Sequence, residues 1–350
     1  MPRRRPDHAV RQREERVHGR EQRSEGAPVI EQEAKAKPAP ALPRLFKVPW
    51  ETIGVPVAII ALAVTFGILS PTFIQLSNVA NISRQIASTG LIAWGQTMVI
   101  LTAGIDLSVG SVAALVSVVA ASMIKSQGTL VGILAGVGVG TLAGLVNGFF
   151  VGKVRMPPFV VTLAMMSAAR GAAMTYTGGV PVFGLESGFL ELVGQRSLAG
   201  IPVSALVAIA GFVVVYLILA RTRFGLALYA IGGSGPAAML AGIPITRYLI
   251  YVYTLCGLLT GISGILLTGR MNSGQPLIGS GLELQSIAAV CIGGTSLFGG
   301  RGSVVGTAFG LLLVGMLTNG LDILGISSFI QQIIIGVVIL VSVLVSLTKR

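Results

Sequence analysis

Residues 130–151 read LVGILAGVGVGTLAGLVNGFFV and contain no charged side chain. A helix needs about 20 apolar residues to cross the ~30 Å hydrocarbon core of a membrane, so this stretch predicts a transmembrane helix. Its glycines recur every four residues, at Gly132, Gly136, Gly140, Gly144 and Gly148. Such a row leaves one helix face bare and lets a neighbouring backbone approach closely. We therefore expect a tightly packed face here, in preference to a sliding surface.

The whole chain has the composition of a membrane protein. Of its 350 residues, 53% are hydrophobic and only 11% are charged, and the mean hydropathy is +0.84. A soluble domain has about 25% charged residues, so this chain could not cover a globule with polar groups. Cys256 and Cys291 lie in apolar runs and are expected to be small core residues. We predict an all-α fold, a polytopic transmembrane helical bundle.

Ten segments qualify as candidate spans. They are 50–69, 80–103, 108–124, 130–151, 158–177, 201–220, 248–268, 284–299, 303–321 and 328–347. Prolines punctuate several of their ends, where a missing backbone N–H costs little. Arg84, Gln85 and Gln96 interrupt the second segment, so we expect a broken or partly water-facing helix there.

The charges indicate which side of the membrane each loop occupies. Residues 1–48 hold 12 of the 25 Lys and Arg residues, mixed with acids and without hydrophobic period, which predicts a disordered basic tail. Basic residues in short loops favour the cytoplasmic side, so both termini are predicted to be cytoplasmic. The outer loops then carry only Lys125, Arg196 and Arg270. The high pI reflects this topology rather than nucleic-acid binding, although attraction of the tail to anionic lipid is an alternative role.

Acidic residues are scarce outside the tail, which excludes several classes of function. The acids there are Glu51, Asp106, Glu186, Glu191, Glu283 and Asp322, all expected in loops or at helix ends. An ion-coupled carrier usually needs a carboxylate or histidine at membrane depth. The sequence also lacks an H-E-x-x-H metal motif and a G-x-x-x-x-G-K-[ST] nucleotide loop. We expect no metal and no cofactor on this chain, so the energy for any work must come from a partner.

The polar motifs between the predicted spans are the remaining candidates for functional residues. In GIDLSVGS (104–111), Asp106 or Ser108 could cap the next helix, which we favour over a direct role in transport. In the long loop 221–247, Pro236 suits the start of a short helix and Gly242 its end. A helix of one or two turns is marginal alone and needs a docking surface, either the underside of the bundle or a second protein.

Together these motifs resemble the permease subunit of bacterial ABC importers for monosaccharides, the ribose/xylose/galactose/arabinose type. The resemblance runs in order from about residue 55 to 347. It is carried by GQTMVILTAGIDLSVGS (95–111), FGLALYAIGGSGPAAMLAGI (224–243), YTLCGLLTGISGILLTGR (253–270), SGQPLIGSGLELQSIAAVCIGGTSLFGGRGSVVGT (273–307) and NGLDILGISSF (319–329).

The resemblance implies a homodimeric, non-catalytic, multi-pass subunit of the bacterial inner membrane. An ATP-binding cassette subunit would bind ATP and Mg²⁺ beneath it, and an extracytoplasmic sugar-binding protein would deliver the cargo. Related permeases move autoinducer, nucleosides or branched-chain amino acids, so another small solute stays an alternative. From other classes, a secondary carrier or a membrane enzyme is the runner-up, and the missing intramembrane carboxylates argue against both.

Two sets of site residues follow. The resemblance makes loop 221–247, within a permease domain of residues 49–350, the region that couples to the ATPase. Its candidate contacts are Arg223, Phe224, Gly225, Gly232, Gly233, Pro236, Ala237, Ala238 and Gly242. We expect Ala238→Arg to uncouple transport while leaving membrane insertion intact. The candidates for the translocation path are the polar residues Arg84, Gln96, Asp106, Ser108, Asn147, Arg170, Gln285 and Asn319. For Arg170, snorkelling toward the outer surface is an equal alternative.

Overall fold

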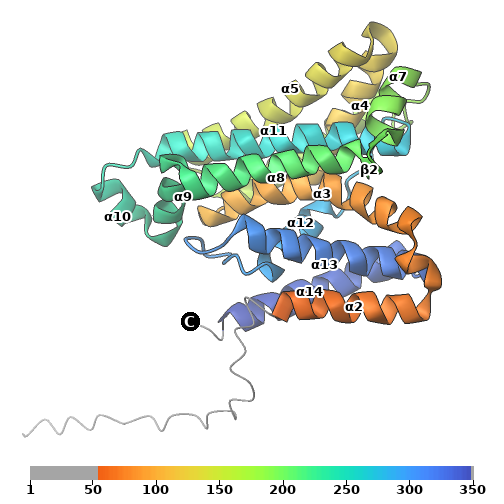
Figure 1. Ribbon diagram of the computed structural model, residues 1–350. Coiled ribbons are helices and arrows are strands. Elements are labelled where there is room, and N and C mark those ends of the chain that lie inside the picture. The colour runs from red at the N-terminus through yellow and green to blue at the C-terminus, as the bar shows by residue number, and fades with distance from the viewer. Residues whose placement is uncertain (1–53, 348–350) are drawn as a thin grey trace, which may run out of the picture. The chain divides into compact units, whose positions relative to one another are not determined.

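The computed structural model describes residues 54–347, and the tail predicted over residues 1–48 lies outside the described residues. The described chain is almost entirely helical, as predicted (Figure 1). Its long helices are α2 (Val55–Leu69), α3 (Leu76–Leu101), α4 (Val109–Gln127), α5 (Thr129–Gly148), α6 (Pro158–Thr177), α8 (Val203–Arg221), α11 (Ile245–Met271), α13 (Val304–Ile323) and α14 (Ser328–Leu347).

Short elements connect these helices. The helical ones are η2 (Pro71–Ile74), η3 (Phe149–Lys153), α7 (Ser187–Phe189), η4 (Leu190–Gln195), α9 (Arg223–Gly233), α10 (Gly235–Leu240) and α12 (Leu282–Ile292). A small antiparallel hairpin, which the sequence analysis did not anticipate, joins β1 (Ser197–Leu198) to β2 (Ile201–Pro202). Its two turn residues, Ala199 and Gly200, both have positive φ, the geometry that favours tight hairpins.

Within residues 54–347, five helices are both long and apolar enough to cross a membrane. They are α4, α5 continued by η3, α8, α11 and α13. The other predicted spans also coincide with helices, but these do not meet both conditions over the residues described. The structure thus confirms the predicted class of fold, an all-helical bundle with several helices that could cross a membrane.

Two predicted spans need correction. The segment 80–103 contains no break, because α3 is continuous from Leu76 to Leu101, but Arg84 and Gln85 line a cavity, which agrees with the alternative of a partly water-facing helix. The segment 284–299 is helical only over α12, since Gly293 ends the helix and Gly294 has a φ of 84°. An 11-residue helix is about 16 Å long and cannot cross ~30 Å of hydrocarbon alone.

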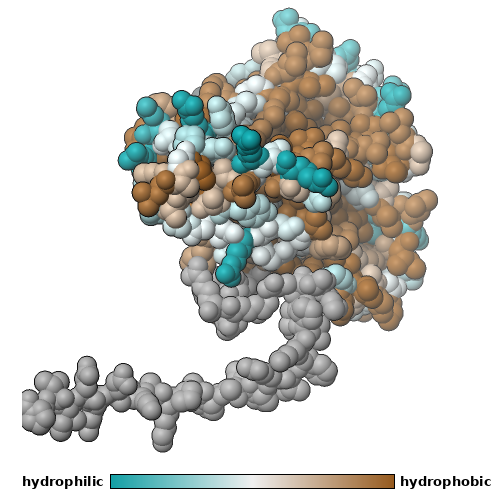
Figure 2. Space-filling view, turned by 60° about the vertical axis from the view of Figure 1, so that its left-hand side comes forward, coloured by the Kyte–Doolittle hydropathy of each residue, from teal (hydrophilic) through white to brown (hydrophobic). Residues whose placement is uncertain are grey.

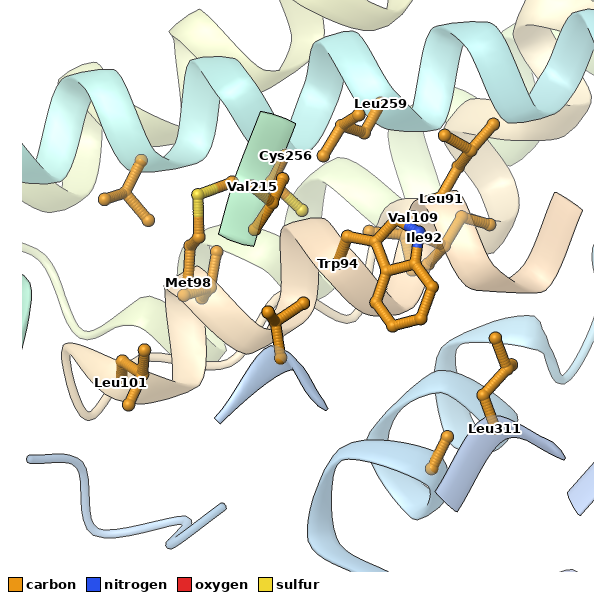
Figure 3. Packing of buried hydrophobic residues seen from close by; sticks show 14 of the residues in the cluster. Leu91, Ile92, Trp94, Met98, Leu101, Val109, Val215, Cys256, Leu259 and Leu311 are labelled. Atoms are coloured by element: carbon orange, nitrogen blue, oxygen red, sulfur yellow. The ribbon is translucent and has the colours of Figure 1, made fainter. Parts of the chain in front are cut away.

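The core lies where α3 passes between α11 and α13. Leu91, Ile92 and Met98 of α3 are at most 1% exposed. Figure 3 shows the side chains of α3 between Cys256 and Leu259 of α11 and Leu311 of α13. Lipid is as apolar as these side chains, so close van der Waals packing holds such helices together. Cys256 and Cys291 are buried free thiols, as predicted.

The glycine row of α5 is a packing face, as predicted. At Gly140, an added Cβ would lie 2.6 Å from Cα of Gly261 and 2.7 Å from the carbonyl oxygen of Gly257, both on α11. At Gly148, it would lie 2.8 Å from Cα of Ile250. The backbones of α5 and α11 therefore touch along most of their contact. On the opposite side of α5, a Cβ on Gly138 would meet nothing within 4 Å.

The outside of the bundle is mostly bulky and apolar. Figure 2 shows brown side chains over much of one face, with hydrophilic ones gathered to one side. The exposed face of α5 carries Leu134, Leu142 and Leu145, and that of α8 carries Ile209 and Val214. Side chains of this kind suit contact with lipid acyl chains.

Candidate functional site

A polar cavity of about 520 Å³ opens among the ends of three helices that are far apart in sequence. It is lined by Asn81, Arg84 and Gln85 of α3, Gly194 of η4, Arg270 of α11, and Asn319 and Asp322 of α13. Two guanidinium groups, one carboxylate and several amides give it both donors and acceptors of hydrogen bonds. The volume falls within the ~300–1,000 Å³ of small-molecule sites.

Paired side chains fix the wall between α3 and α13. Asn78 Nδ2 donates to Asn319 Oδ1 at 2.9 Å, and Asn319 Nδ2 donates to Asn78 Oδ1 at 3.1 Å. About two turns further along α3, Gln85 Nε2 donates to Thr318 Oγ1 at 3.2 Å. Both donor and acceptor of each pair are thereby satisfied inside an apolar bundle. Asn78 and Thr318 were missed from the sequence, although an amide in an apolar helix is a usable signal.

The charged residues of the cavity differ in how firmly they are held. Asp322 Oδ1 accepts a hydrogen bond of 2.7 Å from Gln331 Nε2 of α14, which fixes the carboxylate. Arg84 Nη1 reaches Asn81 Oδ1 only at 3.4 Å. A guanidinium carries five N–H donors, so Arg84 retains several for a bound molecule. Arg270 and Asp322 were not among the predicted path residues.

Four predicted path residues instead form a packed cluster away from this cavity. Ser108 donates to Asp106 Oδ1 through both its backbone N–H at 2.9 Å and its Oγ at 2.6 Å. Asn147 Nδ2 donates to Ser108 Oγ at 3.0 Å, and Gln96 Nε2 donates to the backbone oxygen of Asp106 at 3.1 Å. All four side chains are at most 2% exposed. The cluster ties the turn between α3 and α4 to α5.

The expected helix cap takes a different form in this cluster. Ser108 precedes α4 but makes no side-chain hydrogen bond to its first turn. Asp106 accepts from the N–H of Ser108 itself, so its carboxylate closes the turn before the helix rather than capping the helix. The Ser108 Oγ instead donates to Asp106 Oδ1 at 2.6 Å and accepts from Asn147 Nδ2 at 3.0 Å.

Arg170 and Gln285 lie at two further places. Arg170 Nη1 donates to the backbone oxygens of Pro276 at 2.8 Å and Ile278 at 3.2 Å. The guanidinium is thus held by backbone oxygens of the chain between α11 and α12. We call residues 272–281, which are mostly turns, the α11–α12 connection. Gln285 is half-buried on α12, just beyond that segment, and does not line the polar cavity.

The predicted coupling loop contains two helices in place of one. The first, α9, begins after Thr222, whose Oγ1 accepts a 3.2 Å hydrogen bond from the N–H of Gly225. The second, α10, begins at Gly235, with Ser234 as its cap and Pro236 in its first turn. Gly242 has a φ of 79° and ends it, as predicted.

α9 is fastened to the bundle. Phe224 packs against Tyr248 of α11 with ring centroids 5.4 Å apart. Tyr229 OH donates to the backbone oxygen of Gly302 at 3.0 Å. Burial raises the pKa of the Tyr229 phenol, so it stays protonated and keeps donating. At Gly232, a Cβ would overlap the backbone of Leu101, so only glycine fits.

The exposed surface of α9 and α10 carries three bulky apolar side chains. Leu240 is 91% exposed, Leu226 71% and Met239 61%. Arg223, Gly233, Pro236, Ala237 and Gly242 are also exposed, whereas Gly225 is buried. Ala238 is only 4% exposed, so the expectation that it contacts a partner is wrong. It faces the protein because the 3.6-residue period turns it away from Met239 and Leu240.

Known proteins resemble this chain along most of its length. A protein-family model described as a branched-chain amino acid transport system / permease component matches residues 78–343. The ribose import permease protein RbsC of Bacillus subtilis is 44% identical over 290 residues, which cover 82% of this chain and 90% of that protein. RbsC of Escherichia coli is 42% identical over 301 residues, covering 84% and 93%. The fructose import permease protein FrcC of Rhizobium meliloti is 36% identical over 300 residues, covering 83% of each. No solved structure matches the chain.

Proposed function

We propose that this chain, which belongs to the family of permease components described for branched-chain amino acid transport systems, carries a monosaccharide into the cell. It is the non-catalytic, multi-pass membrane subunit of a bacterial ABC importer. The observation that supports a sugar is the similarity to ribose and fructose permeases over more than four-fifths of the chain. Ribose is the first cargo to test.

The polar cavity favours a sugar over a branched-chain amino acid. Every hydroxyl of a sugar both donates and accepts, and the lining of amides, guanidinium groups and one carboxylate offers partners for both. An aliphatic side chain would need an apolar wall, and the described lining of this cavity holds no large apolar residue. We propose that Arg84 and Asn319 act here in the translocation path, together with Arg270 and Asp322.

The other predicted site residues receive separate roles. Gln96, Asp106, Ser108 and Asn147 act as an internal fastening, since hydrogen bonds join them to one another, although Gln96 Oε1 and Asn147 Oδ1 have no partner among the described residues. The exposed part of loop 221–247 contacts the ATPase, with Leu226, Met239 and Leu240 as its centre. The family implies an ATPase and a binding protein as partners. A second copy of this chain would complete the membrane unit.

We propose ten spans with both termini in the cytoplasm, preceded by a basic cytoplasmic tail over residues 1–48. Single cysteines at Lys125 and Arg196 should react with an impermeant thiol reagent added from outside, after the outer barrier is permeabilised. Cysteines at Lys153 and Arg223 should react only in inverted vesicles. All four side chains are exposed, so access to the reagent is decided by the membrane alone. Labelling of Lys153→Cys or Arg223→Cys from outside would invert the topology.

The function is tested by reconstitution with the cognate ATPase and binding protein in proteoliposomes. Labelled ribose should accumulate only when both partners and ATP are present, and labelled leucine should not accumulate. Arg84→Met removes the donors of one cavity residue, and a hydrogen bond to a charged group is worth about 1.5–3 kcal/mol, so the KM for uptake should rise about tenfold or more.

Arg196→Met is the matched control, since Arg196 is exposed and is absent from the cavity lining. Its uptake should equal that of the wild type. Accumulation of leucine in place of ribose would contradict the sugar assignment. Uptake by the permease alone would contradict the dependence on an ATPase.

A further inference from the structure

Three basic residues lie where α5 ends and α11 begins. Lys153 is the last residue of η3, and Arg155 follows it in the connection to α6. Gly152 packs on the start of α11, because a Cβ there would lie 2.8 Å from the backbone oxygen of Thr246. Arg247 is the next residue of α11, so the backbones that carry Lys153 and Arg247 are neighbours. We call Lys153, Arg155 and Arg247 the basic patch.

The basic patch has no counter-charge within the protein. All three side chains are exposed, and none of them makes a hydrogen bond or an ion pair with another residue that the structure describes. Neither residues 107–185 nor residues 192–282 contain an Asp or a Glu. The ammonium group and the two guanidinium groups therefore keep their N–H donors for an anion from outside the chain.

The backbone at Arg155 is a second and independent sign of a functional position. Its φ is 64°, in the left-handed region that residues other than glycine rarely adopt. Hydrogen bonds hold the turn on both sides, from the N–H of Val154 to the oxygen of Phe149 at 3.2 Å and from the N–H of Met156 to the oxygen of Phe150 at 3.1 Å. Glycine would adopt this turn without strain, so the arginine lowers the stability of the fold. Strained positions of this kind cluster at functional sites.

Bulky apolar side chains lie beside the basic patch. Phe149 is 48% exposed, and Tyr251 of α11 is 55% exposed. Phe149 continues an exposed row of α5 that includes Leu142 and Leu145, since these three positions share one face of a helix with 3.6 residues per turn. From Leu142 to Lys153 the helix rises about 16 Å, close to the ~15 Å of hydrocarbon in one leaflet. The apolar row therefore ends in basic residues at the depth where acyl chains meet headgroups.

We infer that the basic patch binds the phosphate headgroup of an anionic phospholipid whose acyl chains lie along the exposed row of α5. This inference rests on the proposed function, which places this end of the bundle at the cytoplasmic surface of the membrane. Basic pockets between membrane helices at that surface bind anionic headgroups. The bound lipid ties the connection between α5 and α6 to the start of α11. The proposed centre of the ATPase contact lies on other elements, α9 and α10.

The test measures which phospholipid the purified importer retains. The importer, with its ATPase, is placed in mixed micelles that contain equal amounts of phosphatidylglycerol and phosphatidylcholine, and the bound lipids are counted by native mass spectrometry. The wild type should retain phosphatidylglycerol in preference. A basic residue near an anionic lipid contributes about fivefold in affinity, so Lys153→Gln should lower this preference about fivefold. The triple variant Lys153→Gln, Arg155→Gln and Arg247→Gln should lower it about a hundredfold.

Variants of Arg155 separate the charge from the backbone strain. Arg155→Lys keeps the charge and should keep the preference. Arg155→Gly should lower the preference about fivefold, while the unfolding temperature in phosphatidylcholine alone stays the same or rises, because glycine adopts a φ of 64° without strain. Arg301→Gln is the matched control, because Arg301 is an exposed basic residue of the loop that packs on the end of α9. It should leave the preference unchanged.

Several results would overturn the lipid site. Equal retention of the two lipids by the wild type would refute it. An equal loss of preference in Arg301→Gln would mean that the overall charge of this surface attracts anionic lipid without a defined site. Loss of the ATPase from the triple variant, with an unchanged lipid preference, would assign the basic patch to the ATPase.

Sugar uptake by the same importer in proteoliposomes separates this inference from the function on which it rests. Sugar uptake together with equal retention of the two lipids would leave the proposed function standing and overturn only the lipid site. Preferential retention of phosphatidylglycerol without sugar uptake, lost in the triple variant, would overturn the function and leave the lipid site standing.

Discussion

Gly140→Leu should prevent the permease from folding into a stable bundle. The four added carbons would have to occupy the space of Gly261 Cα and the backbone oxygen of Gly257, at distances of 2.6 and 2.7 Å for the first carbon alone. Neither neighbour has a side chain that can move aside, so α5 and α11 must separate. Overpacking costs about 1–3 kcal/mol and more where backbone is displaced, and a loss above that range is expected here.

The measurement is the yield and thermal unfolding of the purified permease in detergent. Gly140→Ala should already lower the unfolding temperature, although alanine favours a helix over glycine by about 1 kcal/mol. Gly138→Leu is the control, because that position faces open space on the same helix. It should give a normal yield and unfolding temperature. A normal bundle for Gly140→Leu would contradict the packing seen between α5 and α11.

Leu240→Arg should lower sugar uptake at least tenfold while leaving the permease folded. Leu240 is 91% exposed, so the larger charged side chain breaks no contact within this chain. If α10 enters an apolar groove of the ATPase, the guanidinium would be desolvated there without a partner. Residues at the centre of an interface commonly contribute about 2 kcal/mol or more, so uptake should fall at least tenfold.

The readouts are sugar uptake and ATP hydrolysis stimulated by the binding protein, both in proteoliposomes. Leu198→Arg, on the hairpin at the opposite end of the bundle, is a matched control with an exposed leucine and should retain both activities. Ala238→Arg has a different expectation, because Ala238 is 4% exposed and the arginine would displace α10 from the bundle. Wild-type coupling in Leu240→Arg would show that the ATPase binds elsewhere.

Much of the fold could be predicted from the sequence because its causes are local. Apolar runs of span length predict helices in a membrane, and the glycine row of α5 predicts a close approach to some neighbour. The ends of α10 depend on Ser234, Pro236 and Gly242, which act within a few residues of themselves. The length of α12 was overestimated because hydrophobicity continues past Gly293, where the backbone turns.

The sites could not be predicted from the sequence, because they depend on which helix ends lie next to one another. A polar residue in a span can face a cavity, another polar residue or a loop, and its own neighbours do not decide among these. Asn319 was selected from sequence and lies at the cavity, but so do Arg270 and Asp322, which were not selected. Asp106, like these residues, is a polar residue near the end of a predicted span, but it is buried in the cluster with Ser108 and does not line the cavity.

By itself, the sequence determined that this protein is a helical membrane bundle with no metal or nucleotide motif and a short helix in its long basic loop. Apolar runs and turn residues exert their effect over a few positions, so these features can be inferred without knowing which distant segments pack together. Only the tertiary structure decided which polar groups share a cavity, that Ala238 is buried beside an exposed Leu240, and that Arg170 holds the α11–α12 connection. These outcomes depend on contacts such as Asn78 with Asn319, which are 241 residues apart, and on the rotation of each helix against its neighbours.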